Sequence, residues 1–259
     1  MKKIIPLISG LGLALFIFTA CTNQQPYNQY IHSYQQLMEA DSFVVQKSDS
    51  LTTSENVADT VEEKNCGIEQ TYRVVRDDAE YTAIANVNMN TEDKASVMLN
   101  TYFRDGYEYG QNMTTPDANY RCQRDADFAR QIAIEGIIDF PENSIAKQSE
   151  EDTDNGHLLT FILDSEKYYE YHYPVTSQEY SYGEFSSYRE PPVYTVLLDQ
   201  QGRIKQVTGH FCEVNSDSSA FTRDQSYTIT LTQYGGVELD FPELNNADYP
   251  DMDAVSTDE

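Results

Sequence analysis

The feature that most constrains the fold of this chain is an alternation of apolar and polar residues with a period of two. Between residues 81 and 89 every odd position is apolar, and shorter alternations run through residues 227–231 and 237–241. Successive side chains of a β-strand point to opposite faces, so each segment predicts a strand with one buried face. The chain is therefore expected to be built mainly on a sheet.

Turn signals divide other apolar segments into hairpins. Asp105-Gly106 supplies the positive φ of a tight turn, and Gln200-Gln201-Gly202 marks a second one. The additional strands predicted in this way are residues 72–76, 97–103, 107–113, 157–164, 191–199 and 203–213. The segment 48–64 is rich in Ser, Thr, Asp and Glu and is expected to form loops.

Two segments have helical periodicity. Apolar or small residues at helical spacing form one stripe before Pro141: Ala129, Ile132, Ala133, Gly136, Ile137 and Phe140. This stripe predicts one long helix, with Asp125 and Asp127 at its N-terminal end and Pro141 as its stop. Tyr30, Tyr34, Leu37 and Met38 are spaced for one face of a short helix that ends before Ser42.

These elements predict a single α+β domain over residues 31–244. Its core is expected to be a curved antiparallel sheet of eight or so strands, with one long helix and one short helix against a single, concave face. Residues 245–259 contain five acidic and no basic side chains, and they are expected to form a disordered tail.

The N-terminus has the pattern of an export signal. Lys2 and Lys3 precede an apolar stretch over residues 4–18, which is too short to span a membrane and reads as a signal peptide over residues 1–20. Phe18-Thr19-Ala20-Cys21 resembles the lipobox of bacterial lipoproteins, with Phe where that family usually has Leu. The resemblance implies that Cys21 is acylated and becomes the first residue of the mature chain. The alternative is an ordinary secretory signal followed by a chance Cys.

The charge of the chain limits its partners. It has 43 acidic and 17 basic side chains, a net charge of −26. Cleavage before Cys21 removes two lysines and no acid, which leaves 15 bases against 43 acids, or −28. Such a chain is not expected to bind nucleic acid or anionic headgroups. Residues 21–30 are expected to be an acylated Cys and a flexible tether that hold the domain at the extracytoplasmic face of a membrane.

The order of elements resembles that of the LolA-like and LppX/LprAFG-type lipoproteins. The local matches are YFRDGYEYGQNM (102–113), YTVLLDQQGRIKQVTGHF (194–211) and GGVELDFPELNNADYPDM (235–252). The resemblance implies a half-barrel sheet over a helix with an apolar cavity between them, in which some members carry lipids or lipoproteins. The side chains expected to face such a cavity are Val87, Met89, Ile132, Ile137, Phe140, Ile229 and Leu231. The same residues would equally suit a filled core.

A tyrosine-rich segment offers a different function. Tyr169, Tyr171 and Tyr173 share a face if this segment is a strand, and tyrosine suits a partly wet contact surface. The alternative hypothesis is therefore a non-enzymatic envelope interaction protein with a closed core and this contact surface. Tyrosine also serves simply as a strand former at half-buried positions.

No motif of an enzyme or a cofactor site is present, so we expect neither catalysis, a bound metal nor a cofactor. His210 and Cys212 share a strand face but lack further ligands. The remaining mature cysteines, Cys66, Cys122 and Cys212, allow three disulfide pairings, among which the sequence does not choose.

Overall fold

The computed structural model describes residues 26–252 except 58–59, 93, 116–117, 173–186 and 215–220. Its helices are α1 (Pro26–Met38), α2 (Phe128–Ile134) and α3 (Ser165–His172), with 3₁₀ turns η2 (Glu142–Ser144) and η3 (Asn246–Asp248). Its strands are β1 (Ser42–Val57), β2 (Thr60–Asp77), β3 (Glu80–Thr91), β4 (Lys94–Arg104), β5 (Tyr107–Asn112), β6 (Tyr120–Gln123), β7 (Ile145–Thr153), β8 (Gly156–Leu163), β9 (Ser187–Tyr188), β10 (Val193–Leu198), β11 (Ile204–Val214) and β12 (Phe221–Tyr234).

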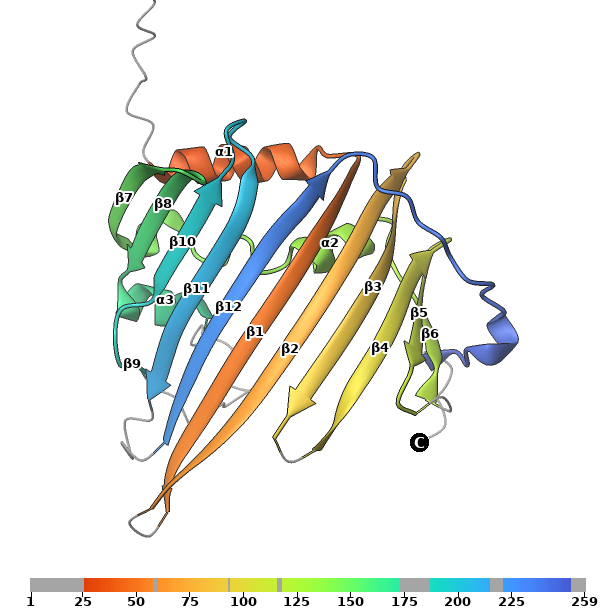
Figure 1. Cartoon of the computed structure of the whole chain (residues 1–259), viewed down its shortest axis with the longest axis horizontal. Coiled ribbons are helices and arrows are strands. Elements are labelled where there is room, and N and C mark those ends of the chain that lie inside the picture. The colour runs from red at the N-terminus through yellow and green to blue at the C-terminus, as the bar shows by residue number, and fades with distance from the viewer. Residues whose placement is uncertain are drawn as a thin grey trace, which may run out of the picture.

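All twelve strands belong to one open antiparallel sheet with the order β6-β5-β4-β3-β2-β1-β12-β11-β10-β8-β7, and β9 pairs with β11 (Figure 1). The expected fold class, a large antiparallel sheet with helices on one face, is confirmed. Most neighbours in the sheet are also neighbours along the chain. The exception at the centre is β1, which pairs with β12 near the other end of the chain. This pairing joins two series of hairpins into one sheet.

The register places the buried residues of adjacent strands in rows across one face. Val45 lies opposite Tyr72 and Leu231, and Tyr72 lies opposite Ala85. All four are at most 5% exposed. In Figure 1, α2 and α3 lie behind the sheet and α1 runs along its upper edge. The core therefore lies between this helix-facing side of the sheet and the three helices.

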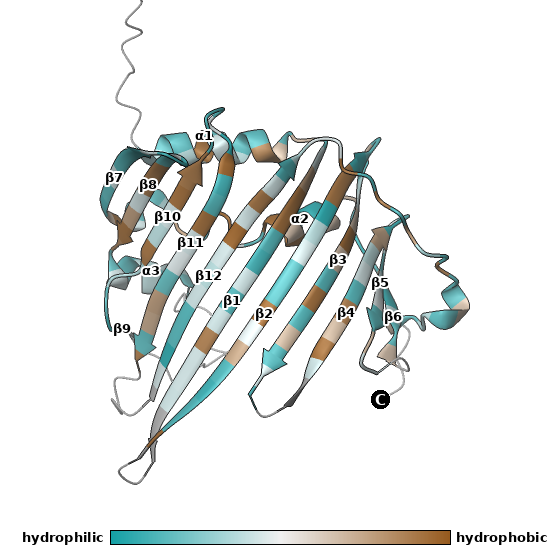
Figure 2. Ribbon diagram, viewed as in Figure 1, coloured by the Kyte–Doolittle hydropathy of each residue, from teal (hydrophilic) through white to brown (hydrophobic). Residues whose placement is uncertain are grey.

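The opposite side of the sheet is mainly polar. One row consists almost entirely of hydroxyl, amide and carboxylate side chains: Thr160, Thr195, Thr208, Thr228, Ser48, Glu69 and Asn88. Figure 2 shows the resulting bands of hydrophilic and hydrophobic residues that alternate along the central strands. The period-two alternation in the sequence therefore reflects strands with one buried face and one polar face.

The prediction of a long helix before Pro141 is wrong. α2 has only seven residues, and the longest helix among the described residues is the predicted short one, α1, with 13. Gly136 has φ = 81°, and Glu135 before it is extended, so the helical path stops there. Ile137 and Phe140 are nevertheless buried, because the loop that follows folds back over the sheet. The residues at helical spacing are thus buried partly by a short helix and partly by the loop that follows it.

The loop predicted over residues 48–64 is also wrong. β1 and β2 continue through this polar segment and pair with each other from Ser42–Val75 to Val57–Thr60. β1 also pairs with β12 as far as Glu55, so its backbone groups are bonded on both sides, whereas β2 gains its second partner, β3, from Cys66 onward. Backbone pairing within a wide sheet outweighs the low apolar content of this segment.

The C-terminal segment differs from both expectations for it. Residues 237–241 do not form a strand; Leu239 and Phe241 instead pack beside Ile84 and Tyr102 on the outer face. The expected disorder does not begin at residue 245, because Tyr249 is 5% exposed against Tyr109. A backbone bond from Arg121 to Pro250 covers the edge of β6. An uncovered edge strand invites pairing with other chains, which this contact prevents.

The three cysteines of the described chain lie far apart. Cys66 is on β2, Cys122 on β6 and Cys212 on β11. At least three strand spacings, about 14 Å in total, separate any two of these strands. A disulfide requires Cα atoms within about 7 Å of each other. None of the three pairings left open by the sequence fits this sheet.

Candidate ligand groove

A groove of about 680 Å³ runs between α1, α2 and the loop after α2. Its lining comprises Tyr34, Met38, Asp127, Phe128, Gln131, Ile132, Ile134, Glu135, Gly136, Ile138 and Asp139. Six of these side chains are apolar or aromatic, and most are half-buried rather than enclosed. We refer to this hollow as the helix groove. Its size is in the range of small-molecule sites, and its lining combines apolar side chains with polar ones.

A buried lysine fixes the wall formed by α2. Lys47 lies on central strand β1, and its Nζ donates hydrogen bonds to the carbonyl oxygens of Ile132 (2.8 Å) and Glu135 (2.9 Å). These carbonyls belong to the C-terminal end of α2, where helical partners are missing and a cation is favourable. Burial lowers the pKa of Lys47 to about 8. The sheet thus holds the end of this short helix in place.

An arginine joins the two helices at the other end of the groove. One guanidinium nitrogen of Arg130 donates to the carbonyl of Met38 (2.8 Å), and another donates to Asp127 (2.6 Å). The same guanidinium lies over the ring of Tyr81, 4.7 Å from its centre. Because only 15% of the Arg130 side chain is exposed, these contacts fix the distance between α1 and α2.

The carboxylate of Asp139 ends the groove and is part of a buried polar cluster. Its Oδ2 accepts hydrogen bonds from the hydroxyls of Tyr168 (3.2 Å) and Tyr194 (3.1 Å), which also bond to each other. His172 Nε2 lies 3.7 Å from the same oxygen. Burial raises the pKa of the Asp139 carboxyl, although His172 and the tyrosine hydroxyls oppose this shift. The side chain remains 29% exposed.

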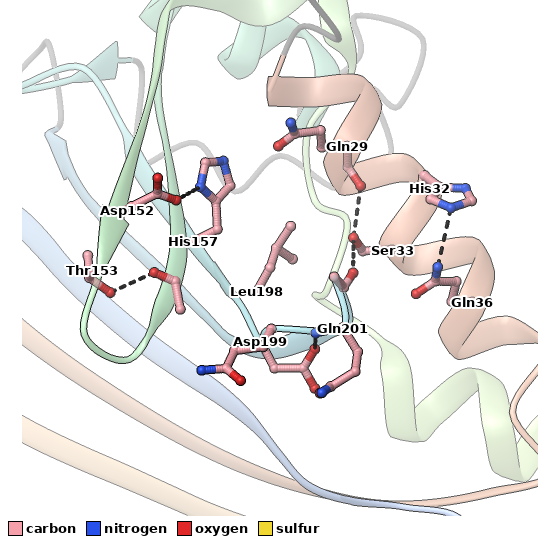
Figure 3. A pocket seen from close by; sticks show the side chains of 13 residues that line it. Gln29, His32, Ser33, Gln36, Asp152, Thr153, His157, Leu198, Asp199 and Gln201 are labelled. Carbon is pink, nitrogen blue, oxygen red and sulfur yellow. Dashed lines mark hydrogen bonds and ion pairs between the residues drawn. The ribbon is translucent and has the colours of Figure 1, made fainter. Parts of the chain in front are cut away.

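A second hollow, of about 660 Å³, is polar. It lies between α1, the tip of the β7–β8 hairpin and the β10–β11 turn (Figure 3). Its charged groups are already paired: His157 with Asp152 (2.8 Å), and Asp199 with Arg203 (2.8 Å). Amide side chains form much of the remaining wall. Leu198 is the one large apolar side chain among its described lining residues, whereas the helix groove has six apolar or aromatic side chains, so we take the helix groove as the candidate site.

The structure distributes the predicted cavity residues over three places. Ile137, Phe140, Ile229 and Leu231 are at most 5% exposed and belong to one packed core cluster. Ile132 lines the helix groove. Val87 and Met89 lie on the helix-facing side of β3, farther along the strand than Ala83 and Ala85. Val87 is half-buried there and Met89 is 36% exposed.

The predicted tyrosine surface is not a strand. Tyr169 and Tyr171 lie on helix α3, where neighbours two apart do not share a face. Tyr169 is half-buried against the core, and Tyr171 is 50% exposed. Tyr173 and the lipidation candidate Cys21 lie outside the described residues.

Sequence reasoning missed the polar residues that shape the groove. Lys47 lies just before the loop predicted over residues 48–64 and belonged to no predicted element, although it alternates with Phe43 and Val45 and so belongs to the buried face. Asp139 stood in the stripe predicted as helix. Tyr168 and Tyr194 are 26 residues apart, and no local signal indicates that they meet Asp139.

Within the described residues, no cluster of three or more His, Cys, Asp or Glu side chains has the arrangement of a metal site. No helix of the described chain qualifies as a membrane span. The class that fold and site define is therefore an open antiparallel sheet, covered by helices on one face, with a partly apolar groove between two of them.

The comparisons with known proteins give a distant likeness in fold. No family model and no curated protein matches the chain. A DUF1329 family protein of Desulfovibrio piger aligns with TM-score 0.26 and 8% identity over 80% of this chain and 92% of its own. Lipovitellin aligns with TM-score 0.35 and 10% identity over 78% of this chain and 26% of its own. An outer membrane lipoprotein-sorting protein domain of Vibrio parahaemolyticus aligns with TM-score 0.22 and 7% identity, over 84% and 95%.

Proposed function

We propose that this protein is a lipid-anchored binding protein at the extracytoplasmic face of a bacterial membrane, without enzymatic activity, and that it holds an apolar or amphipathic ligand in the helix groove. The groove carries the ligand part of this proposal. It combines a volume of about 680 Å³ with half-buried Met38, Phe128, Ile132 and Ile138. Burial of one methylene group of a ligand in the groove contributes about 0.8 kcal/mol of favourable free energy to binding.

The position of α1 connects the proposed anchor to the groove. α1 begins at Pro26, five residues after Cys21, and its other end supplies Tyr34 and Met38 to the groove. Five residues span at most about 17 Å, so an acylated Cys21 would keep α1 close to the bilayer. A ligand from the membrane would then reach the groove over a short distance.

The anchor is tested by the Cys21→Ala variant in the full-length chain. We expect the wild-type protein to fractionate with membranes and the variant to appear in the soluble extracytoplasmic fraction. Mass spectrometry of the wild-type N-terminal peptide should show acyl groups on Cys21. A Cys21→Ala protein that stays membrane-bound would refute the acyl anchor without affecting the groove.

Ligand binding is tested with N-phenyl-1-naphthylamine, a neutral apolar dye whose fluorescence rises on leaving water. We expect micromolar binding by the wild-type protein and a loss of about tenfold or more in the Ile132→Glu variant, which places a charge in the groove. Ile31→Glu is the matched control, because Ile31 is a half-buried helix residue that does not line the groove. Equal binding by both variants would contradict the proposed site.

The alternative function, an envelope interaction protein with a closed core, is favoured by one observation. Tyr171 is exposed on α3, next to a core packed from Ile137, Phe140, Ile229 and Leu231. If this alternative is right, the dye does not bind, and Tyr171→Ala weakens the association with an envelope partner. Dye binding that responds to Ile132→Glu decides for the ligand groove.

A further inference from the structure

We propose that the helix groove selects ligands that join an apolar body to a cationic group. This inference rests on the proposed function, because it specifies the chemistry of the ligand in the same groove. Three of the lining side chains, Asp127, Glu135 and Asp139, are carboxylates. None of the residues described in the lining is Lys, Arg or His.

Among the carboxylates described in the lining, Asp127 is the one in an ion pair with an arginine or lysine. Arg130 neutralises Asp127 at 2.6 Å. Lys47 lies on the sheet side of α2, where its ammonium protons bond to the carbonyl oxygens of Ile132 and Glu135. Glu135 is exposed at the rim of the groove. A cationic group would therefore meet Glu135, and Asp139 with His172 as its nearest basic side chain at 3.7 Å, rather than the Asp127–Arg130 ion pair.

The carboxylate of Asp139 is held in a fixed position at one end of the helix groove. Tyr168, Tyr194 and His172 all approach its Oδ2, and Oδ1 makes none of these contacts. The two hydroxyls fix the carboxylate while part of it stays open to the groove. Burial makes its negative charge costly, as the raised pKa indicates, and a nearby cation would offset that cost.

The apolar side chains of the lining would contact the apolar body of the ligand. Tyr34, Met38, Phe128, Ile132 and Ile138 surround the space between the two ends of the groove. An anionic amphiphile would gain the same apolar contacts but would bring its charge near two carboxylates. The net charge of −26 adds to this discrimination at low ionic strength.

The test compares three amphiphiles with the same ten-carbon chain: decyltrimethylammonium, decyl sulfate and neutral decyl maltoside, each below its critical micelle concentration. Calorimetric titration of the mature protein should give decyltrimethylammonium at least about tenfold tighter binding than decyl sulfate. The preference should shrink as salt is raised, because screening weakens the carboxylate contribution.

Variants of the lining carboxylates test which of them cause the preference for the cationic amphiphile. Glu135→Gln and Asp139→Asn keep the shape of each side chain and remove its charge, so each should lower several-fold the ratio of the affinity for decyltrimethylammonium to the affinity for decyl maltoside. Glu166→Gln is the matched control, because Glu166 is an exposed acid on α3 outside the groove. Thermal unfolding of each variant verifies that the groove is intact, and Glu135→Gln, at an exposed position, keeps the test valid if Asp139→Asn unfolds.

The outcomes separate this inference from the proposed function. Equal affinity for the three amphiphiles, or a preference that Glu135→Gln and Asp139→Asn leave unchanged, overturns the charge selection but keeps the apolar site. Absence of binding by all three overturns both.

Discussion

The ammonium of Lys47 donates a hydrogen bond to the carbonyl oxygen of Ile132, 2.8 Å away and 85 residues further along the chain. The bond ties the centre of the sheet to the end of α2. It allows a seven-residue helix, too short to be stable by itself, to form one wall of the groove. Because burial lowers the pKa of Lys47 to about 8, this contact has a measurable dependence on pH.

The free energy of unfolding should rise between about pH 8 and pH 10. In this window the folded protein releases the proton of Lys47, whereas the unfolded chain, with an ordinary lysine pKa near 10.5, still binds it. The gain is at most about 1.4 kcal/mol per pH unit. Urea unfolding at several pH values measures it. Lys47→Met should lose the rise, whereas Lys205→Met, at an exposed position on β11, should keep it.

Above pH 10 the stability should fall again. Burial raises the pKa of Tyr72 to about 12, and it also raises the pKa of Tyr168 and Tyr194. The unfolded chain loses these protons from about pH 10, and the folded chain retains them, so high pH favours unfolding. Absorbance at 295 nm should show a group of tyrosines that ionise only as circular dichroism reports unfolding. Ionisation of all tyrosines near pH 10 in the folded protein would contradict this.

Removal of one hydroxyl from the Asp139 cluster should destabilise the protein. Tyr194→Phe removes one buried hydroxyl partner from both Asp139 and Tyr168, which keep their bond to each other, and this loss should cost about 1–3 kcal/mol. Tyr171→Phe serves as the control, because Tyr171 is 50% exposed and its change should stay within about 0.5 kcal/mol. Similar unfolding midpoints for the two variants would show that the cluster contributes no stability.

Two turn glycines should differ in their tolerance of alanine. Gly156 ends the β7–β8 turn with φ = 138°, and a Cβ there would lie 2.0 Å from the carbonyl oxygen of Leu198. Gly202 has φ = 75°, but no atom lies within 4 Å of its added Cβ. Gly202→Ala should therefore cost only about 1–2 kcal/mol of backbone strain, and Gly156→Ala should cost clearly more. Equal thermal unfolding temperatures would disprove the close approach.

The C-terminal segment should protect the edge of the sheet. Tyr249 is 5% exposed and packs edge-to-face on Tyr109, with ring centres 5.4 Å apart. Tyr249→Ala should cost about 3 kcal/mol or more and increase hydrogen exchange at the backbone amides of β6. Met252→Ala, at a 54% exposed position, should change neither quantity. Unchanged β6 exchange in Tyr249→Ala would show that the edge needs no cover.

The sequence predicted what depends on neighbours along the chain. The alternation at residues 81–89 and the turn at Asp105-Gly106 correspond to β3 and to the β4–β5 hairpin, and the spacing of Tyr30 and Leu37 corresponds to α1. The prediction failed where distant pairing overrides local pattern. Residues 48–57 form a strand because β12 and β2 bond to both of its edges. The helix before Pro141 ends early because Glu135 and Gly136 leave the helical conformation, and Lys47 of the sheet bonds to the carbonyl oxygens at its end.

By itself, then, the sequence determined the two-faced strands, the hairpins and the acidic surface, since each follows from side-chain polarity at fixed spacing. Only the tertiary structure decided where the groove lies. Its walls come from Tyr34 and Met38 on one side and from residues 127–139 on the other, about ninety residues later. Lys47, Arg130 and Asp139 hold those walls through hydrogen bonds to residues that are distant in the chain. Contacts between such distant segments leave no periodic signal in the sequence, so only the folded chain reveals them.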